Sequence, residues 1–186
     1  MKRFLSRIFN YLISKVFEEP KFIYLSLDAE NFKHSVNKTD RNSKVFIANI
    51  DHKESIEKEL FPHFDNQQEY FKQFLNFDRE DILCYLCEKN NKLVHYFLVF
   101  KNAKTSPLLK TRFKKKLDSY HQTAYLGNAF TISSERGGWI VLQVLSKIIQ
   151  DLRELHGISK FIVLVHPDTP GALKFYQRLG FQIINY

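Results

Sequence analysis

Apolar residues recur at helical spacing in several parts of the chain. Over residues 1–19, apolar positions at a period of 3.6 residues alternate with Lys and Arg, which predicts an amphipathic helix. Residues 137–155 place one continuous apolar face along a long helix. A final helix begins with Thr169 as its cap and Pro170 at its first position, and it ends at Gly180. Shorter helices are predicted at residues 52–60 and 67–75.

Apolar runs of strand length lie between these helices. Residues 161–165 are apolar without interruption, which is typical of a strand covered on both faces. Residues 82–87 and 93–100 flank a polar turn and therefore predict an antiparallel hairpin. The remaining predicted strands cover residues 21–27, 45–50, 123–132 and 181–186.

The length and composition fit one compact domain with an appended helix. The chain has 186 residues, 44% of them hydrophobic, and its 18 Phe and 9 Tyr can fill a dense core. This composition excludes intrinsic disorder. We therefore expect an amphipathic helix over residues 1–19, followed by a folded domain over residues 20–186.

The chain is basic, and much of its basicity is local. Its 28 Lys and Arg against 20 Asp and Glu give a formal charge of +8, which favours phosphorylated ligands, nucleic acid or an anionic membrane as partners. Residues 101–116 hold seven basic residues and no acidic one. Such a run is either solvated surface or the contact for a phosphate-bearing partner. Nucleic acid is disfavoured, because the sequence has no zinc-finger spacing, RNA-binding signature or evident recognition helix.

Three sequence features bear on where the protein works. No apolar run reaches about 18 residues, so no membrane-spanning helix is expected. The helix over residues 1–19 can lie on a membrane surface, on its own domain, or on a second copy in a homodimer. Cys84 and Cys87 fall on one strand, where residues three apart face opposite ways and cannot share a metal or a disulfide. We expect a cytoplasmic protein without a metal, or one held peripherally at the inner face of the membrane.

Residues 133–139 join a strand to the amino terminus of a helix. Free backbone N–H groups and the helix dipole favour an anion at such a place. Gly137 and Gly138 let the main chain approach a pyrophosphate, and Arg136 adds a fixed fork of N–H donors. Glycine pairs also occur in plain turns, so these residues alone leave both a phosphate site and a structural turn open.

Two motifs in this part of the chain resemble the GNAT N-acetyltransferase superfamily. Arg136-Gly137-Gly138-Trp139-Ile140-Val141 is similar to its cofactor turn, and Ala172–Phe181 is similar to its closing Tyr-x-x-x-Gly-Phe segment. The resemblance covers residues 124–186 and implies an α/β (α+β) fold, with a mixed central sheet and helices on both faces. It also implies an acyl-CoA N-acyltransferase that moves an acetyl group from acetyl-CoA to a primary amine, without a metal.

The resemblance extends to the acceptor. Residues 123–152 look similar to family members of bacterial polysaccharide biosynthesis, where an amino sugar on a nucleotide or lipid carrier is acetylated. The basic residues 101–116 would then contact the diphosphate of this acceptor, and residues 1–19 would bring the enzyme to the membrane. A small-molecule amine is the alternative acceptor.

The resemblance also assigns roles to individual residues. The strands at residues 123–132 and 161–165 would separate and admit the pantetheine arm of acetyl-CoA. Tyr176 would act as acid unless it is a core tyrosine. The resemblance does not assign the base; His166, which follows the second of these strands and titrates near neutrality, would serve directly or through water unless it is structural. Asn128 would orient the acceptor. The residues expected to hold the cofactor are Phe130, Thr131, Ile132, Arg136, Gly137, Gly138, Trp139 and Thr169. Further candidates for the base are His121 and Glu135.

Several departures from the family pattern qualify this assignment. Trp139 and Val141 stand where the cofactor turn usually has glycines, and Thr169, which can still cap its helix, replaces an asparagine. The strand at residues 123–132 lacks the carboxylate that many members use as base. These departures favour an alternative, a catalytically inactive GNAT-fold binding or regulatory module. The chain also stops where a further strand is usual, so residues 21–27 or a second subunit should cover that edge.

Overall fold

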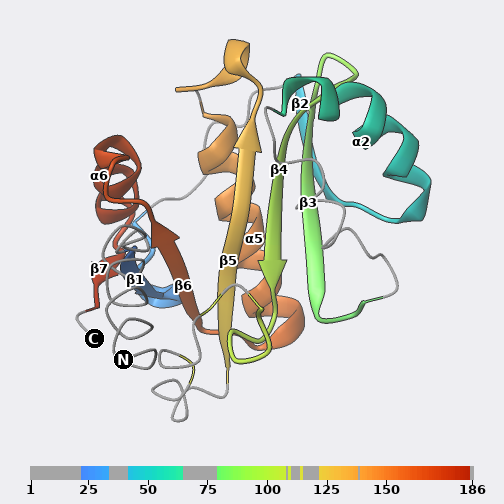
Figure 1. Ribbon diagram of the computed structural model, residues 1–186. Coiled ribbons are helices and arrows are strands. Elements are labelled where there is room, and N and C mark those ends of the chain that lie inside the picture. The colour runs from blue at the N-terminus through green and yellow to red at the C-terminus, as the bar shows by residue number, and fades with distance from the viewer. Residues whose placement is uncertain are drawn as a thin grey trace, which may run out of the picture.

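The computed structural model describes residues 22–33, 42–64, 79–107, 109, 114, 122–137 and 139–184. Seven strands form one sheet in the order β2-β3-β4-β5-β6-β1-β7 (Figure 1). The strands are β1 (Ile23–Asp28), β2 (Ser43–Ile47), β3 (Ile82–Lys89), β4 (Lys92–Phe100), β5 (Thr123–Thr131), β6 (Lys160–Val165) and β7 (Gln182–Ile183). The α-helices are α2 (Lys53–Glu59), α5 (Ile140–His156) and α6 (Pro170–Arg178). Short 3-10 turns are η1 (Ala29–Asn31), η2 (Ile50–His52), η3 (Phe61–His63) and η5 (Ser133–Glu135).

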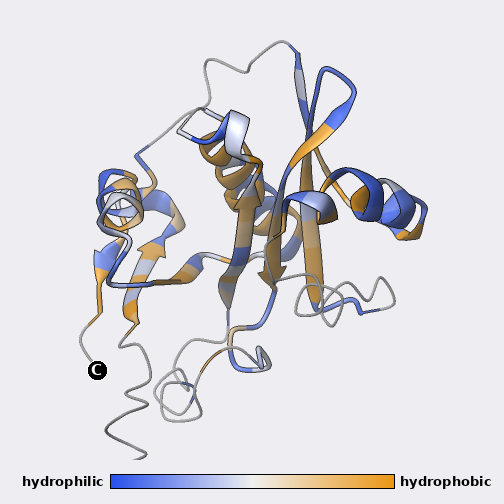
Figure 2. Ribbon diagram, turned by 45° about the horizontal axis from the view of Figure 1, so that its top comes forward, coloured by the Kyte–Doolittle hydropathy of each residue, from blue (hydrophilic) through white to orange (hydrophobic). Residues whose placement is uncertain are grey.

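The sheet is mixed and carries helices on both faces. β5 and β6 run parallel, and the other neighbouring strands are antiparallel. α5 and α6 cover one face, where Val144 and Leu152 are fully buried. α2 and η3 cover the other face with Ile56 and Phe61. The predicted α/β fold is therefore confirmed, and the apolar strands at its centre lie between these two layers (Figure 2).

The long helix α5 begins later than predicted. The sequence predicts a helix from residue 137, whereas α5 begins at Ile140. Gly137 adopts φ +78°, a left-handed conformation that a right-handed helix cannot contain. The segment before α5 is therefore the 3-10 turn η5 followed by an open loop. At its other end α5 stops at Gly157, which adopts φ +64°, as the sequence predicts.

Two predicted strands are shorter in the structure. Of the strand predicted at residues 181–186, the structure shows the two residues of β7, after buried Phe181, and residues 185–186 lie outside the described residues. The strand predicted at residues 45–50 ends at Ile47, and η2 and α2 follow. The predicted helices at residues 1–19 and 67–75 lie outside the described residues.

β1 lies inside the sheet, between β6 and β7. It is antiparallel to both, and its register with β6 runs from Ile23↔Val165 to Asp28↔Lys160. Backbone pairing with β6 therefore covers the edge that would otherwise be open. The prediction that a strand at residues 21–27 takes this place is confirmed.

The turn after α6 packs closely against the segment that follows β1. Gly180 adopts φ +102°, and a Cβ atom there would collide with the backbone carbonyl oxygen of Asn31. The backbone N–H of Lys33 donates to the Leu179 carbonyl at 3.1 Å. The glycine of the Tyr-x-x-x-Gly-Phe segment is therefore required by packing as well as by its own backbone conformation.

The two cysteines face opposite sides of the sheet, as predicted. Cys84 belongs to the core under α2, and Cys87 belongs to the core under α5. Both are buried and neither forms a disulfide, and burial raises the pKa of Cys84. Their positions on β3 keep them from binding one metal or forming a disulfide with each other.

A buried carboxylate helps to fix α5 against β3. Asp151 is 7% exposed, and its carboxylate accepts hydrogen bonds from the Tyr85 hydroxyl at 3.4 Å and the Lys147 ammonium at 2.7 Å. Burial and the neighbouring Asp151 charge raise the pKa of Tyr85. A paired carboxylate costs little in this place, whereas an unpaired one would be strongly unfavourable.

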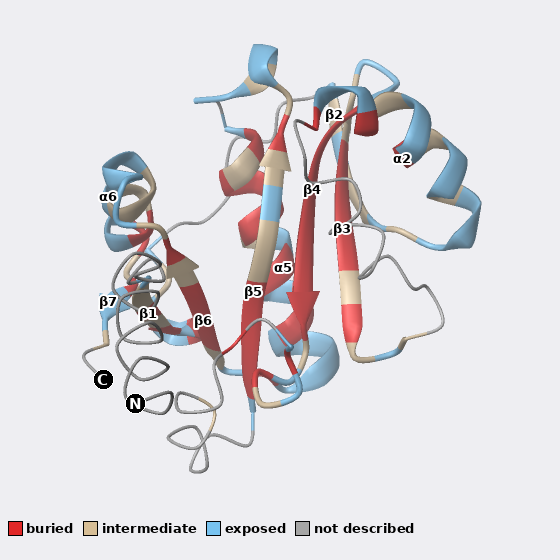
Figure 3. Cartoon of the chain, in the orientation of Figure 1, coloured by how far each residue is buried: buried red, intermediate tan, exposed pale blue. Residues whose placement is uncertain are grey.

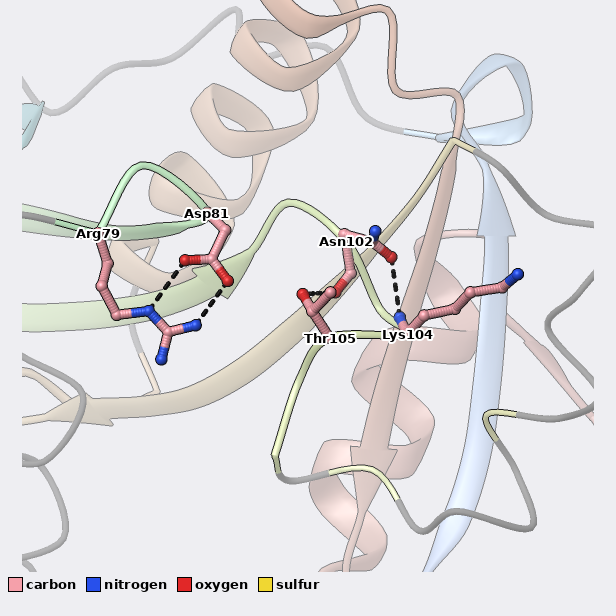
Figure 4. Close-up of polar contacts among 5 residues, drawn as sticks. All are labelled: Arg79, Asp81, Asn102, Lys104 and Thr105. Atoms are coloured by element: carbon pink, nitrogen blue, oxygen red, sulfur yellow. Dashed lines mark hydrogen bonds and ion pairs between the residues drawn. The ribbon is translucent and has the colours of Figure 1, made fainter.

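A polar corner joins the start of β3 to the loop after β4 (Figure 4). Arg79 donates to Asp81 through Nε at 2.9 Å and a terminal nitrogen at 2.6 Å, which lowers the pKa of the Asp81 carboxyl. The side chain of Asn102 accepts from the Lys104 N–H at 3.0 Å, and its carbonyl accepts from the Thr105 hydroxyl at 3.1 Å. These bonds hold the loop after β4 in a tight turn.

The position of this corner shows where the basic run begins. Ala103 N–H donates to the Thr123 carbonyl at 2.8 Å, so the loop lies at the amino-terminal end of β5. The segment with Arg136 follows the other end of the same strand. The nine residues of β5 therefore separate Lys101 and Lys104 from Arg136.

Gly180→Ala should lower the free energy of unfolding by about 2 kcal/mol or more, because it combines a strained φ with a backbone collision. Gly171→Ala is the matched control on the same helix, where an added Cβ has nothing within 4 Å. It should leave stability unchanged or raise it by up to about 1 kcal/mol. Urea unfolding measures both, and equal midpoints would contradict the packing argument.

Candidate active site

The hydrogen-bond ladder between β5 and β6 stops halfway along β5. The two strands pair from Thr123↔Lys160 to Leu126↔Val163, and no pairing continues beyond that point. Ala129 is exposed although β5 lies in the middle of the sheet, and Figure 3 shows this change of burial along the strand. The predicted separation of these two parallel strands is confirmed.

A β-bulge marks the point of separation. Two residues of β5, Gly127 and Asn128, stand opposite Leu98 of β4. A Cβ at Gly127 would lie 3.0 Å from both the Leu98 carbonyl oxygen and the Phe100 ring, so a glycine suits this close approach. The bulge bends β5 where it leaves β6, and it places half-buried Asn128 at the start of the separation.

The carboxyl end of β5 is bound by the residue that follows η5. The Nε of Arg136 donates to the Thr131 carbonyl at 3.0 Å. The guanidinium carbon lies 5.7 Å from the centre of the Phe130 ring, a cation–π distance. Phe130 packs with Tyr96 and Phe64 on the face covered by α2. The structure thus brings three predicted cofactor residues, Phe130, Thr131 and Arg136, together.

A buried histidine that the sequence does not single out supports Thr131 from the α5 side. His95 pairs with Thr131 across β4 and β5, and its Nδ1 lies 2.8 Å from the Thr131 hydroxyl. The side chain is fully buried, and burial lowers the pKa of His95 to about 3. Its Nε2 has no hydrogen-bond partner among the described residues. The ring is therefore neutral at physiological pH and acts as a fixed support.

The turn before α5 is open to an anion. The side chain at the N-cap position of α5 makes no capping bond to the first turn of the helix. Gly137 has no atom within 4 Å of an added Cβ, and Trp139 is 60% exposed. Glu135 is paired with Lys89 at 2.9 Å, which ties this turn to the β3–β4 hairpin. Gly138 and the base candidate His121 lie outside the described residues.

Tyr176 lies in the last turn of α6, the helix that follows β6. In the sheet, β6 lies on one side of the separation, and β5 and β4 lie on the other. It is 9% exposed and packs edge-on against the rings of Phe175 and Phe181. Burial raises the pKa of its hydroxyl. A phenol in this environment keeps its proton at neutral pH, and the raised pKa makes it a weaker acid than an exposed tyrosine.

His166 and Thr169 lie together after β6. The Nδ1 of His166 accepts the Asp168 N–H at 3.2 Å, and the ring packs edge-on against Phe22, beside β1. The Thr169 hydroxyl donates to the His166 carbonyl at 2.6 Å and makes no capping bond to α6. Thr169 is the N-cap residue of α6, followed by Pro170 at the start of the helix, as predicted, but its hydroxyl makes no capping bond because it bonds backward along the chain.

These features define a class of protein, an acyl-CoA N-acyltransferase, in which two parallel strands separate before a helix with an open amino terminus. Residues 46–181 match the acetyltransferase (GNAT) family, and the chain belongs to that family. No curated protein matches the sequence closely.

Solved structures of acetyltransferases share this fold at low sequence identity. Aminoglycoside N-acetyltransferase AAC(6')-Iy, in complex with a CoA bisubstrate analogue, aligns with TM-score 0.56 and 13% identity, over 77% of this chain and 96% of that one. A GNAT family acetyltransferase from Elizabethkingia anophelis with acetyl-CoA bound aligns with TM-score 0.56 and 17% identity, over 78% and 80%. The ribosomal-protein-alanine N-acetyltransferase from Brucella melitensis biovar Abortus aligns with TM-score 0.55 and 10% identity, over 77% and 94%.

The described residues were compared with what a membrane span and a metal site require. None of the helices there is long and apolar enough to cross a membrane. In the same part of the chain, no three His, Cys, Asp or Glu side chains are grouped so that they could hold a metal ion.

His95 should make stability depend on pH. The unfolded chain takes up a proton on this histidine below its ordinary pKa of 6.5, whereas the folded chain does so only near 3. The free energy of unfolding should therefore fall by roughly 1.4 kcal/mol per pH unit through this group as the pH drops through that window.

His95→Gln should remove this contribution, and His156→Gln, at an exposed histidine of α5, should keep it. Urea unfolding between about pH 4.5 and 7.5 gives the slopes. The same slope in both variants would contradict a neutral, buried His95.

Proposed function

We propose that the protein transfers the acetyl group of acetyl-CoA to the primary amine of an acceptor. The observation that carries the proposal is the end of the β5–β6 ladder after Leu126, followed along the chain by the uncapped amino terminus of α5. The unpaired backbone of β5 offers hydrogen-bond groups to the amides of a pantetheine arm. The open helix terminus offers N–H groups to the pyrophosphate.

Different residues would contact the pantetheine arm and the pyrophosphate of acetyl-CoA. Phe130, Thr131 and Ile132 would line the pantetheine arm along the end of β5. Gly137 and Trp139 would line the pyrophosphate at the start of α5, with Gly138 between them in the sequence. Thr169, at the start of α6, would contact the donor from the β6 side.

The chemistry requires two proton movements. The neutral amine attacks the thioester carbon, the C–N bond forms, and the C–S bond breaks to release the thiolate of CoA. The amine nitrogen must lose a proton, and the thiolate must gain one. We assign the second step to Tyr176, because it is the tyrosine of the Tyr-x-x-x-Gly-Phe segment and lies in the last turn of α6. Asn128, at the bulge, would orient the amine.

Water is our first candidate for the proton acceptor. His166 is the second, since its Nδ1 lone pair already accepts the Asp168 N–H at 3.2 Å. To take a proton on Nδ1, His166 would first have to release this bond. Glu135 would likewise have to leave Lys89. A water that passes the proton to solvent needs neither rearrangement.

For the acceptor we propose an amine on a phosphate-bearing carrier, such as an amino sugar on a nucleotide or lipid diphosphate. Support comes from the basic run, whose Ala103 and Leu109 pack on the same face of the sheet as α2. An acceptor that meets Lys101 and Lys104 with its phosphates would have to extend from the amino-terminal end of β5 to Asn128 in the same strand. A lipid carrier would require peripheral contact with the membrane, for which residues 1–19 are our candidate.

A binding module without catalysis is the second candidate function. Two observations favour it. The bulky Trp139 stands in the turn that would hold the pyrophosphate, and Arg136 already occupies the Thr131 carbonyl. If these contacts persist in solution, the site is closed to CoA.

Acetyl-CoA should bind with a change in tryptophan fluorescence. Trp139 is the single Trp of the chain and is 60% exposed at the start of α5, so a nucleotide bound there alters its surroundings. At about 100 times its Kd, the ligand should add roughly 2.7 kcal/mol to the free energy of unfolding. Calorimetry and emission spectra measure the binding, with desulfo-CoA as control. No binding at millimolar acetyl-CoA would reject the transferase in favour of the binding module.

Tyr176→Phe should lower kcat by about 100-fold and leave the Kd for acetyl-CoA unchanged, because only the proton donor is lost. Tyr85→Phe is the control, since it removes a buried hydroxyl between β3 and α5 that the mechanism does not use. Steady-state rates with a nucleotide-linked amino sugar, and in parallel with a peptide amine, provide the readout. A Tyr176→Phe enzyme with normal kcat would show that this tyrosine is a core residue.

A further inference from the structure

The peptide group between Thr131 and Ile132 is held on one side by β4. Its N–H, on Ile132, donates to the Val94 carbonyl at 3.0 Å. The carbonyl of a trans peptide points the opposite way, so the Thr131 oxygen faces away from β4, toward the separation from β6. The Thr131 side chain is fixed as well, by His95 Nδ1 at 2.8 Å. Thr131 therefore presents its carbonyl to the site in a fixed direction.

In the structure, Arg136 donates a hydrogen bond to this carbonyl. Its Nε donates to the Thr131 oxygen at 3.0 Å, and its guanidinium lies over Phe130. Arg136 is an exposed residue, and a guanidinium carries further N–H donors besides Nε. A pantetheine amide that pairs with the Thr131 carbonyl must therefore compete with Arg136 for it.

We propose that Arg136 makes the site selective for acyl donors that carry phosphate, an inference that rests on the proposed function. A pyrophosphate at the neighbouring start of α5 draws the guanidinium away from Thr131, because a hydrogen bond between two charged groups is stronger than one to a neutral carbonyl. The freed carbonyl then accepts an N–H from the pantetheine arm. A thioester without phosphate has to displace Arg136 without this compensation, so it binds poorly.

Arg136→Met should move the affinities of two donors in opposite directions. Acetyl-CoA loses a phosphate partner, and its Kd should rise about tenfold. S-acetylpantetheine, which has no phosphate, loses a competitor, and its Kd should fall about threefold. The preference for acetyl-CoA over S-acetylpantetheine should therefore drop about thirtyfold. Calorimetry measures both constants, and kcat/KM with each donor provides a second readout.

Arg153→Met, at an exposed arginine near the other end of α5, is the matched control and should change neither constant. Thermal unfolding verifies that both variants are folded, as expected for exposed side chains. If wild-type protein binds acetyl-CoA but Arg136→Met leaves the Kd of S-acetylpantetheine unchanged or higher, the selectivity role is refuted and the proposed function stands. If wild-type protein binds no acetyl-CoA, the proposed function fails and this inference fails with it.

Discussion

The interrupted ladder between β5 and β6 is the constraint on which the candidate site depends. Backbone N–H and C=O groups in the middle of a sheet need partners, and those of β5 beyond Leu126 find none on β6. Water, a side chain or a ligand must therefore supply them. Arg136 supplies one such partner from the neighbouring turn. The unpaired backbone groups of β5 that bind this side chain would also bind the amides of a cofactor arm.

The elements around this interruption are firmly connected, so the site rests on a rigid frame. Asp151 joins α5 to β3 through Tyr85, and the pair of Lys89 with Glu135 joins the hairpin to the turn. His95 fixes Thr131 from the side of α5. A frame of this kind keeps β5 from closing onto β6, although pairing the two strands would satisfy more of their backbone groups.

The sequence predicts the features of the fold that depend on local pattern. Helix periods, apolar runs and the alternation that separates Cys84 from Cys87 are all properties of neighbouring residues. The structure confirms them in its described residues, whereas the helices at residues 1–19 and 67–75 stay predictions. His95 could not be found in this way, because its role depends on its register with Thr131, far away in the sequence. The sequence did not predict the hydrogen bond from Arg136 to Thr131 for a related reason. It requires the 3-10 turn η5, and the turn predicted between the strand and the helix does not by itself specify this path back toward β5.

The insertion of β1 between β6 and β7 has a consequence for biosynthesis. β1 leaves the ribosome early, but its partner β6 is made only after most of the chain, and β7 comes later still. Contacts of such long sequence separation form slowly. The apolar strand β1 therefore stays exposed while the β3–β4 hairpin can already fold. During this interval the nascent protein presents the strand edge that the finished sheet encloses. The synthesis of β6 and β7 thus completes a sheet in which β1 was made long before.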